Sequence, residues 1–507
     1  MSYIPTIGLE IHAELKTRTK MFCDSKNDAD EKRPNVNVCP VCMAHPGTLP
    51  VINREAVRHV LRVGAALGGT LADYTEFDRK NYFYPDLPKG YQLSQYEYPL
   101  VSGGELAGVA ITRVHLEEDT ASSMHISTSF DEAQDKSLNA GDEEAGSTVV
   151  DYNRAGVPLM ELVSEPVIHS AEEASAFARE LQLLLRYLGA SEANMEKGEM
   201  RVEANVSVAA ATERYKKQDT RNKQLGTKVE IKNLNSFNIM ERAVTYEIKR
   251  QIEMLERGEK IAQETRGWDD GKQVTFPQRL KEGSADYRYF PDPDLPSLKL
   301  SEISEFSHDA LISGMPETPR GRRERYVGLG LKRQDAEMFV RRPGYGALFD
   351  AVAAALPASD PTVLLTANLI ANNVAGIRDT KERDTDFSAD MPMSSQHLKV
   401  LVSMIVSKKI TSNAAKIVLS ESLKTGQDPE KIATDKGLLG TFNVADLEGI
   451  VGNVLKQNGK VVMEYQAGKT AALQFLVGQV MRASKGAADP LVVRSVIDKV
   501  LEGLKSQ

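Results

Sequence analysis

The sequence predicts an α+β protein in which an antiparallel sheet comes first and helices follow. Residues 1 to about 295 contain several segments in which apolar and polar side chains alternate, the period of a half-buried strand. From about residue 301 the apolar side chains recur at helical spacing instead. The proline-rich stretch "FPDPDLPSL" (290–298) separates the two regions. We therefore expect a domain boundary near residue 295.

The alternating segments place polar side chains on one face of the predicted sheet. In "IGLEIHAEL" (7–15), Glu10, His12 and Glu14 oppose the apolar residues, and we expect Glu14 to be solvated. The same period occurs in "GVAITRVHLEED" (108–119), "MRVEANVSV" (200–208) and "TKVEIKN" (227–233). In the first of these, strict alternation gives one face Ala110, Thr112, Val114, Leu116 and Glu118, and the other face Arg113, His115, Glu117 and Asp119. A carboxylate that shares a face with valine and leucine must be paired or coordinated.

Two helices are marked by caps and apolar stripes. Ser170 and Glu173 form a capping box before a stripe that Gly189 ends. A second stripe starts near Ser236 and runs to Gly258. Both stripes are expected to face the core.

Length, composition and charge limit the class of protein. A chain of 507 residues with 41% hydrophobic and 26% charged residues is expected to form two to four soluble domains. No run of about 18 apolar residues predicts a membrane span, and the N-terminus resembles no targeting segment, so we expect a cytoplasmic protein without membrane contact. The net charge is −8, yet residues 401–507 carry +4, which favours that region for phosphate contacts, although a solvated helical surface explains it equally well.

Several loops combine charge with turn-forming residues. Residues 77–96, "FDRKNYFYPDLPKGYQLSQY", mix bases with five aromatic rings, and their prolines and glycine predict a structured loop rather than a strand. Such loops often bind nucleotides, but a surface loop with a buried aromatic base is as good an explanation. Arg154, Arg279, Lys281 and Arg288 lie in turn-rich segments and could clamp phosphates. The string "AGKT" (467–470) is not a P-loop, because Met463 replaces its first glycine.

Two sets of residues could bind metal ions. Carboxylates in the alternating strands, Glu10, Glu117, Glu118, Asp119 and Glu203, offer the oxygen donors that Mg²⁺ prefers. Cys23, Cys39 and Cys42 offer three thiolates, and a tetrahedral zinc site would need a fourth ligand from Asp24, Ser25, His45 or water. The alternative is three free thiols.

Taken together, these segments resemble one family. The matching strings are "IGLEIHAEL", "NVCPVCMAHPGTLPVIN", "FDRKNYFYPDLPKGYQLSQ", "HLEEDT", "DYNRAGVPLMELVSEP", "MRVEANVSV", "GTKVEIKNLNSFN", "QETRGWD" and "DYRYFPDPDLP". They keep their order over residues 4–296 and resemble GatB, a component of the tRNA-dependent amidotransferase. The string "GKTAALQFLVGQVMRASKGAADP" (468–490) is similar to the same family.

The resemblance implies a ligase that forms a carbon–nitrogen bond with glutamine as amido donor. GatB works in a heterotrimer with the amidase GatA and the small subunit GatC. It binds misacylated Glu-tRNA(Gln) or Asp-tRNA(Asn) and uses ATP and Mg²⁺ to phosphorylate the side-chain carboxylate. Ammonia, channelled from glutamine hydrolysis in GatA, then displaces phosphate. The sequence does not say which tRNA is the substrate. Alternatives from other classes are a zinc-containing tRNA-binding protein without catalysis and a scaffold subunit.

The resemblance also implies site residues and domains. Glu10, His12 and Glu118 would hold Mg²⁺, with Glu203 as a fourth ligand where the family usually has Asp. Lys80 and Lys89 would lie by the active site and the ammonia route. Many members have C-x-C before C-x-x-C, and here Ser25 replaces the second cysteine, which leaves three for a structural Zn²⁺. The expected domains are a cradle (1–295), a helical domain (296–400) and a helical, tRNA-binding tail (401–507).

Overall fold

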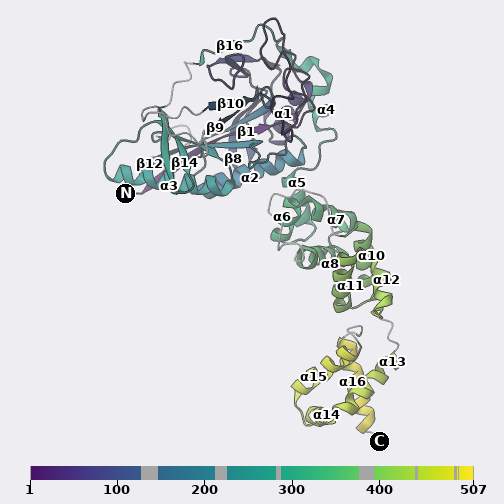
Figure 1. The fold of residues 1–507 in the computed structure, drawn as a ribbon. Helices are drawn as coiled ribbons and strands as arrows, with labels where there is room; N and C mark the ends of the chain where they lie inside the picture. Colours follow the sequence, from purple (N-terminus) through teal and green to yellow (C-terminus); the bar gives the residue numbers. More distant parts are fainter. Residues whose placement is uncertain are drawn as a thin grey trace, which may run out of the picture. The chain divides into compact units, whose positions relative to one another are not determined.

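The computed structural model describes residues 2–126, 147–211, 225–280, 287–375, 393–439, 444–484, 488 and 490–505. The chain divides into two compact units, Met1–Thr318 and Pro319–Gln507 (Figure 1). All assigned strands lie in the first unit, and the assigned elements of the second are helical. The predicted order of sheet followed by helices is therefore confirmed, while the boundaries at 295 and 400 stay predictions. Most of the acidic stretch 129–147 lies outside the described residues.

The strands of the first unit form one large sheet and three small ones. Their bounds are β1 Tyr3–Glu14, β2 Thr70–Leu71, β3 Tyr74–Thr75, β4 Asp78–Asn81, β5 Tyr91–Ser94, β6 Val101–Ser102, β7 Glu105–Leu106, β8 Val109–Glu118, β9 Ser122–Ile126, β10 Ser147–Asp151, β11 Pro158–Ser164, β12 Met200–Ala210, β13 Val229–Leu234, β14 Glu264–Asp269, β15 Val274–Leu280, β16 Phe290–Pro291 and β17 Leu298–Lys299. The large sheet has the order β15-β14-β13-β12-β1-β11-β8-β6-β2, and β7 pairs with β8. Among its assigned pairs only β13–β14 is parallel, so the predicted antiparallel sheet is present.

Helices α1 (Arg54–Ala66), α2 (Ala171–Tyr187) and α3 (Phe237–Glu256) cover one face of the large sheet. Helix α1 contacts β8, α2 contacts β1, and α3 contacts β12 and β13, with α2 and α3 side by side (Figure 1). The residues of β1 on this face, among them Leu9 and Ile11, are almost fully buried. Alternation leaves the polar side chains of the same strands on the opposite face, away from these three helices.

The two predicted helices begin and end as their caps indicate. The Ser170 hydroxyl accepts a hydrogen bond from the backbone N–H of Glu173, and Gly189 follows α2 with φ +65°. The Ser236 hydroxyl caps α3 in the same way, accepting from the N–H of Ile239. Both apolar stripes face the core, which confirms the prediction.

The structure corrects three expectations about the strands. Residues 77–96 are not a continuous loop, because β4 and β5 form a hairpin and the two prolines fall in the connection between them. The alternation predicted for 108–119 changes phase, because the pairing of β8 with β11 shifts register near Thr112, so Ile111 is buried and Thr112 exposed. Glu14 is half-buried rather than solvated, and burial together with the charge of Asp119 raises its pKa to about 8.

The remaining helices follow the sheet. The first unit ends with η4 Leu300–Glu302, η5 Ser304–Phe306 and α4 His308–Ile312, and the second contains α5 Pro319–Gly328, α6 Arg333–Arg341, α7 Pro343–Ala353, α8 Pro361–Leu369, η6 Ile370–Val374, α10 Ser395–Val406, α11 Ser412–Thr425, α12 Pro429–Asp435, α13 Val444–Gln457, α14 Gly459–Gln466, α15 Thr470–Ala483 and α16 Pro490–Lys505. Helices α13, α15 and α16 share an apolar cluster of their own. Among the described residues, no helix is long and apolar enough to cross a membrane.

The first unit can be tested separately, because the single tryptophan of the chain, Trp268, lies in β14. We predict that Leu181→Ala, in a fully buried position of α2, lowers the free energy of unfolding by about 2–5 kcal/mol. Leu49→Ala, the same change at an exposed leucine, should cost less than about 0.5 kcal/mol. Urea denaturation followed by Trp268 fluorescence measures both values. Equal losses in the two variants would contradict the assigned core.

Candidate active site

A row of charged side chains crosses the polar face of four neighbouring strands. In the register of the sheet, His115 of β8 lies opposite Glu161 of β11, Glu161 opposite His12 of β1, and His12 opposite Arg201 of β12. Directly paired residues in antiparallel strands project from the same face, so these four side chains stand next to one another. The sheet register thus brings together four segments that are far apart in the sequence.

His12 is the centre of this row. Its Nε2 lies 3.3 Å from a Glu161 oxygen, 3.5 Å from a Glu117 oxygen and 3.9 Å from a Glu10 oxygen. Burial lowers the pKa of His12, but the hydrogen bonds to Glu117 and Glu161 outweigh burial and hold the pKa well above its usual value. His12 is therefore positively charged among three carboxylates in this arrangement.

His115 flanks the same carboxylates from the other side. Its Nε2 lies 3.5 Å from Glu161 and 4.0 Å from Glu117, and the residue is only 2% exposed. Burial lowers the pKa of His115, and its Nδ1 makes no hydrogen bond within the described part of the chain. Burial raises the pKa of Glu161, but the two histidines outweigh burial and hold that pKa below its usual value. Both Glu161 and Glu117 are thus kept ionised.

Glu10 extends the cluster towards β12 and β13. It pairs in register with Glu203, whose carboxylate lies 2.8 Å from the Lys232 Nζ. Burial and the charges of Glu161 and Glu203 raise the pKa of Glu10 to about 7. One cation, Lys232, therefore faces Glu203 and Glu230 at 2.8 and 4.0 Å, while Glu10 lies between acidic neighbours.

The charged cluster lines a cavity of about 180 Å³. The β4–β5 hairpin supplies Lys80, Tyr82 and Gln92 to its wall. Burial lowers the pKa of Lys80, but the Glu117 carboxylate and other neighbours outweigh burial and raise it above its usual value. The remaining lining residues are Glu10, His12, Glu117, Asp119, Thr120, Leu159, Arg201, Glu203 and Lys232.

Three overlapping sets of side chains in and around this cluster have the spacing of metal ligands. The donor atoms within each set lie within 4.8 Å of one another. The sets are Glu10, His12 and Glu161; Glu10, Glu203 and Glu230; and His115, Glu117 and Glu161. Their oxygen-rich composition fits a hard divalent cation such as Mg²⁺, and His12 is a softer exception.

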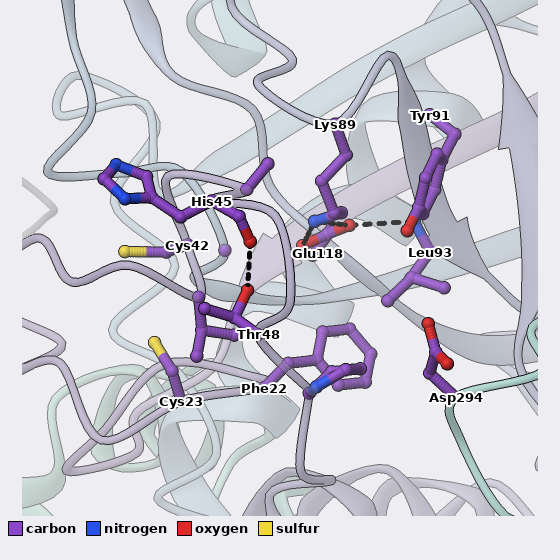
Figure 2. Close-up of a pocket in the computed structure, with 14 residues that line it drawn as sticks. Phe22, Cys23, Cys42, His45, Thr48, Lys89, Tyr91, Leu93, Glu118 and Asp294 are labelled. Atoms are coloured by element: carbon purple, nitrogen blue, oxygen red, sulfur yellow. Dashed lines mark hydrogen bonds and ion pairs between the residues drawn. The ribbon is translucent and has the colours of Figure 1, made fainter.

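Glu118 lies in a different place from Glu10 and His12. Consecutive strand residues project to opposite faces, so Glu117 enters the charged cluster and Glu118 points away from it. The Glu118 carboxylate accepts hydrogen bonds from Lys89 Nζ at 2.6 Å and from the backbone N–H of Leu93 at 2.9 Å (Figure 2). Among the described residues the structure thus brings Glu10, His12 and Glu203 together, as the resemblance implied, but not Glu118.

Lys89 and Glu118 share a second cavity with the cysteines. This cavity, also of about 180 Å³, is lined by Cys23, Cys42 and His45 as well (Figure 2). The three cysteine sulfurs lie within 4.8 Å of one another, and the Cys39 and Cys42 sulfurs are 3.9 Å apart. Two thiolates on one zinc ion lie about 3.8 Å apart, given Zn–S bonds of about 2.3 Å. The sulfur geometry therefore fits zinc.

The fourth corner of that cluster contains oxygen and nitrogen rather than sulfur. The Ser25 hydroxyl and the Lys20 Nζ each lie 3.8 Å from the Cys42 sulfur. The hydrogen bond with Cys23, a backbone N–H and the Lys20 charge lower the pKa of Cys42 to about 4. The site therefore holds a stabilised thiolate with an incomplete set of sulfur ligands.

Comparison with known proteins agrees with the ordered motifs and with this site. The family model described as the GatB/GatE catalytic domain matches residues 5–304, and the one described as the GatB domain matches residues 348–501. This chain belongs to the GatB family. A relative from Thermomicrobium roseum is 42% identical over 99% of both chains, and one from Gloeothece citriformis is 39% identical over 99% of this chain and 98% of its own. The names of both relatives describe the GatB component of an aspartyl/glutamyl-tRNA(Asn/Gln) amidotransferase.

The four cations predicted to bind phosphate are not gathered in this GatB-family site. Arg154 donates to the backbone carbonyls of Thr120 and Ala121 and lies 3.6 Å from Asp119, so it holds the chain rather than facing a cavity. Arg288 is exposed with φ +44°. Lys281 and the side chain of Arg279 lie outside the described residues. Phosphate contacts for these residues remain predictions.

Sequence reasoning did not single out Glu161, His115 or Arg201 as site residues. Glu161 lies inside the apolar run "PLMELVS", and a lone acid in a buried strand was the available signal. His115 and Arg201 have the correct phase in their strands, but alternation cannot show which strands are neighbours. The register of the sheet supplies that information.

The Lys89–Glu118 pair provides a test of this geometry. Lys89→Met leaves the almost fully buried Glu118 carboxylate without its cation, and we predict a loss of about 3 kcal/mol in the free energy of unfolding. Adding Glu118→Gln should restore most of that loss, because the uncompensated charge is gone. Urea denaturation with Trp268 fluorescence measures all four members of the cycle. Strictly additive losses would show that the two side chains do not interact.

Proposed function

We propose that this chain is the tRNA-binding subunit of an amidotransferase and uses ATP to activate the side-chain carboxylate of a misacylated tRNA. The substrate is Glu-tRNA(Gln), Asp-tRNA(Asn) or both. The observation that carries the proposal is the cluster of Glu10, His12 and Glu161 at the wall of a cavity that also contains Lys80. The relatives are named amidotransferase subunits, so membership of the family makes the chain part of a carbon–nitrogen ligase.

The chemistry explains why such a site needs both carboxylates and cations. A carboxylate resists attack by an amine because it carries negative charge and has no good leaving group. Transfer of a phosphoryl group to the carboxylate creates an acyl phosphate, in which ammonia can displace phosphate. The developing negative charge must be stabilised by fixed positive groups. Lys80, Arg201 and Lys232 line the cavity and can supply that charge.

The donor set fits Mg²⁺. Glu10, His12, Glu161 and Glu203 would hold the ion, and Glu161 replaces Glu118 in the set that the resemblance implied. When bound, Mg²⁺ would neutralise phosphate oxygens of ATP and orient the transferred group. The chain's own residues bind and orient the substrate carboxylate near Lys80 and keep Glu117 and Glu161 ionised through the two histidines.

Ammonia must come from elsewhere in this scheme. The family resemblance assigns glutamine hydrolysis to the amidase GatA. We propose a heterotrimer with GatA and GatC, located in the cytoplasm. The Lys89–Glu118 cavity is the proposed entrance for ammonia, and residues 401–507, with their positive charge, are the proposed contact to the tRNA body.

The proposal predicts the outcome of carboxylate substitutions. Glu10→Gln and Glu161→Gln should each lower amide formation on Glu-tRNA(Gln) or Asp-tRNA(Asn) by at least about 100-fold, because each removes a charged ligand of the cluster. The control is Glu165→Gln, an exposed strand-end carboxylate whose partner is the Thr112 hydroxyl. The measurement is ATP-dependent amide formation by the complex with purified partner subunits, together with tRNA binding by filter retention.

The same experiment separates the alternatives. Retained tRNA binding with lost amide formation supports catalysis at the cluster. Unchanged turnover in both variants would contradict it. A wild-type complex that binds misacylated tRNA but forms no amide would favour the non-catalytic tRNA-binding or scaffold hypothesis.

A structural zinc ion at Cys23, Cys39 and Cys42 is a separate part of the proposal. We predict about one zinc per chain after purification without chelators, and none in Cys42→Ser, because three thiolates are the minimum that this geometry offers. Elemental analysis by inductively coupled plasma mass spectrometry gives both values. A zinc content near zero in the wild-type protein would show that the cysteines are free thiols.

A further inference from the structure

Five tyrosines form a continuous series of ring contacts beside the charged cavity. In order they are Tyr84, Tyr82, Tyr287, Tyr289 and Tyr96, here called the tyrosine ladder. Their successive ring centroids are 5.9, 5.9, 6.1 and 4.2 Å apart. The first three contacts are edge-to-face, and the last is stacked with 12° between the ring planes. The ladder joins segments that are about 200 residues apart in the sequence.

The ladder is a surface feature and not part of the core. Tyr84 is 54% exposed and Tyr96 47% exposed, and the adjacent Phe83 and Phe290 are 80% and 45% exposed. A contiguous group of exposed aromatic side chains is unusual on a protein without a partner and marks an interaction surface.

The ladder begins at the cavity and carries positive charge. Tyr82 lines the cavity that contains Glu10 and His12. The Lys80 Nζ lies 5.2 Å from the centroid of the Tyr287 ring and 5.9 Å from that of Tyr82. A path of aromatic rings therefore leads from solvent, past a lysine, to the charged cluster.

We propose that the tyrosine ladder binds the unpaired 3′-terminal nucleotides of the tRNA by stacking on their bases. The inference rests on the proposed function, in which the reacting carboxylate is attached to the terminal nucleotide. That carboxylate must enter the cavity while the double-stranded part of the tRNA stays outside. A ladder of rings that includes Tyr82 at the cavity wall spans this distance and holds the single strand in the required direction.

The chemistry of the ladder favours single-stranded nucleic acid over a protein partner. Unpaired bases stack on aromatic side chains, and a nearby cation attracts the phosphates. Tyr96 is already stacked on Tyr289, so a base on its outer face continues an existing stack. Tyrosine hydroxyls tolerate water at the rim of such a site.

The test uses the full-length protein and a fluorescein-labelled short single-stranded RNA that ends in CCA. We expect Tyr84→Ala and Tyr96→Ala each to weaken binding by about 5- to 100-fold, the range for loss of one base stack. Tyr84→Phe and Tyr96→Phe keep the rings and should bind within about twofold of wild type. The matched control is Tyr98→Ala, which removes a tyrosine of similar exposure outside the ladder. Fluorescence anisotropy measures the dissociation constants.

Salt dependence gives a second readout. Stacking releases no counterions, so the alanine variants should leave the slope of log Kd against log salt unchanged. Wild-type affinity in both alanine variants, or equal losses in the phenylalanine and alanine variants, would overturn the proposal. Unchanged RNA binding with loss of co-purification of the amidase subunit would also overturn it, and would assign the ladder to a protein interface.

The proposed function fails or stands independently of this result. Amide formation by the wild-type complex tests the function, whereas RNA affinity of the ladder variants tests the ladder. A wild-type complex that forms amide while ladder variants bind RNA normally refutes the ladder alone. A ladder that binds RNA in a complex without amide formation refutes the function alone.

Discussion

The buried row of charges on four central strands is the constraint on which the rest of the first unit depends. Glu161 and Glu117 can be ionised in this position only because His12 and His115 flank them. Burial of unpaired carboxylates would cost several kcal/mol each, so the strands must hold the partners in place. The register of β8, β11, β1 and β12 does this, since His115, Glu161, His12 and Arg201 are direct cross-strand neighbours.

The same register also fixes the core. A slip of one residue in β1 would turn His12 towards α2 and Leu9 or Ile11 towards the cavity. The apolar face and the charged face therefore specify each other. Glu10 is the member of the cluster whose charge is least compensated, because its pKa lies at about 7 while its neighbours Glu161 and Glu203 are acidic. A divalent cation among these carboxylates would relieve that repulsion, which links the stability of the sheet to the proposed chemistry.

Alternation in the sequence was sufficient to place Glu10 and His12 on one face, and caps were sufficient to locate α2 and α3. It could not identify Glu161, because a strand buried on both sides reads as an apolar run with one acid and gives no phase. It gave Glu118 a face away from the polar one, and the structure agrees, although the resemblance had placed that residue at the metal. The β4–β5 hairpin was hidden by prolines that lie in its connection. Cross-strand neighbours depend on strand order, which no local pattern contains.

The central claim is that Glu10, His12 and Glu161 form one divalent-cation site. Crystals of the complex grown with Mn²⁺ in place of Mg²⁺, measured at the manganese absorption edge, test it directly. The account predicts an anomalous peak within about 2.5 Å of oxygens from Glu10 and Glu161. A manganese peak bound instead by Glu118, with none among Glu10, His12 and Glu161, would contradict it.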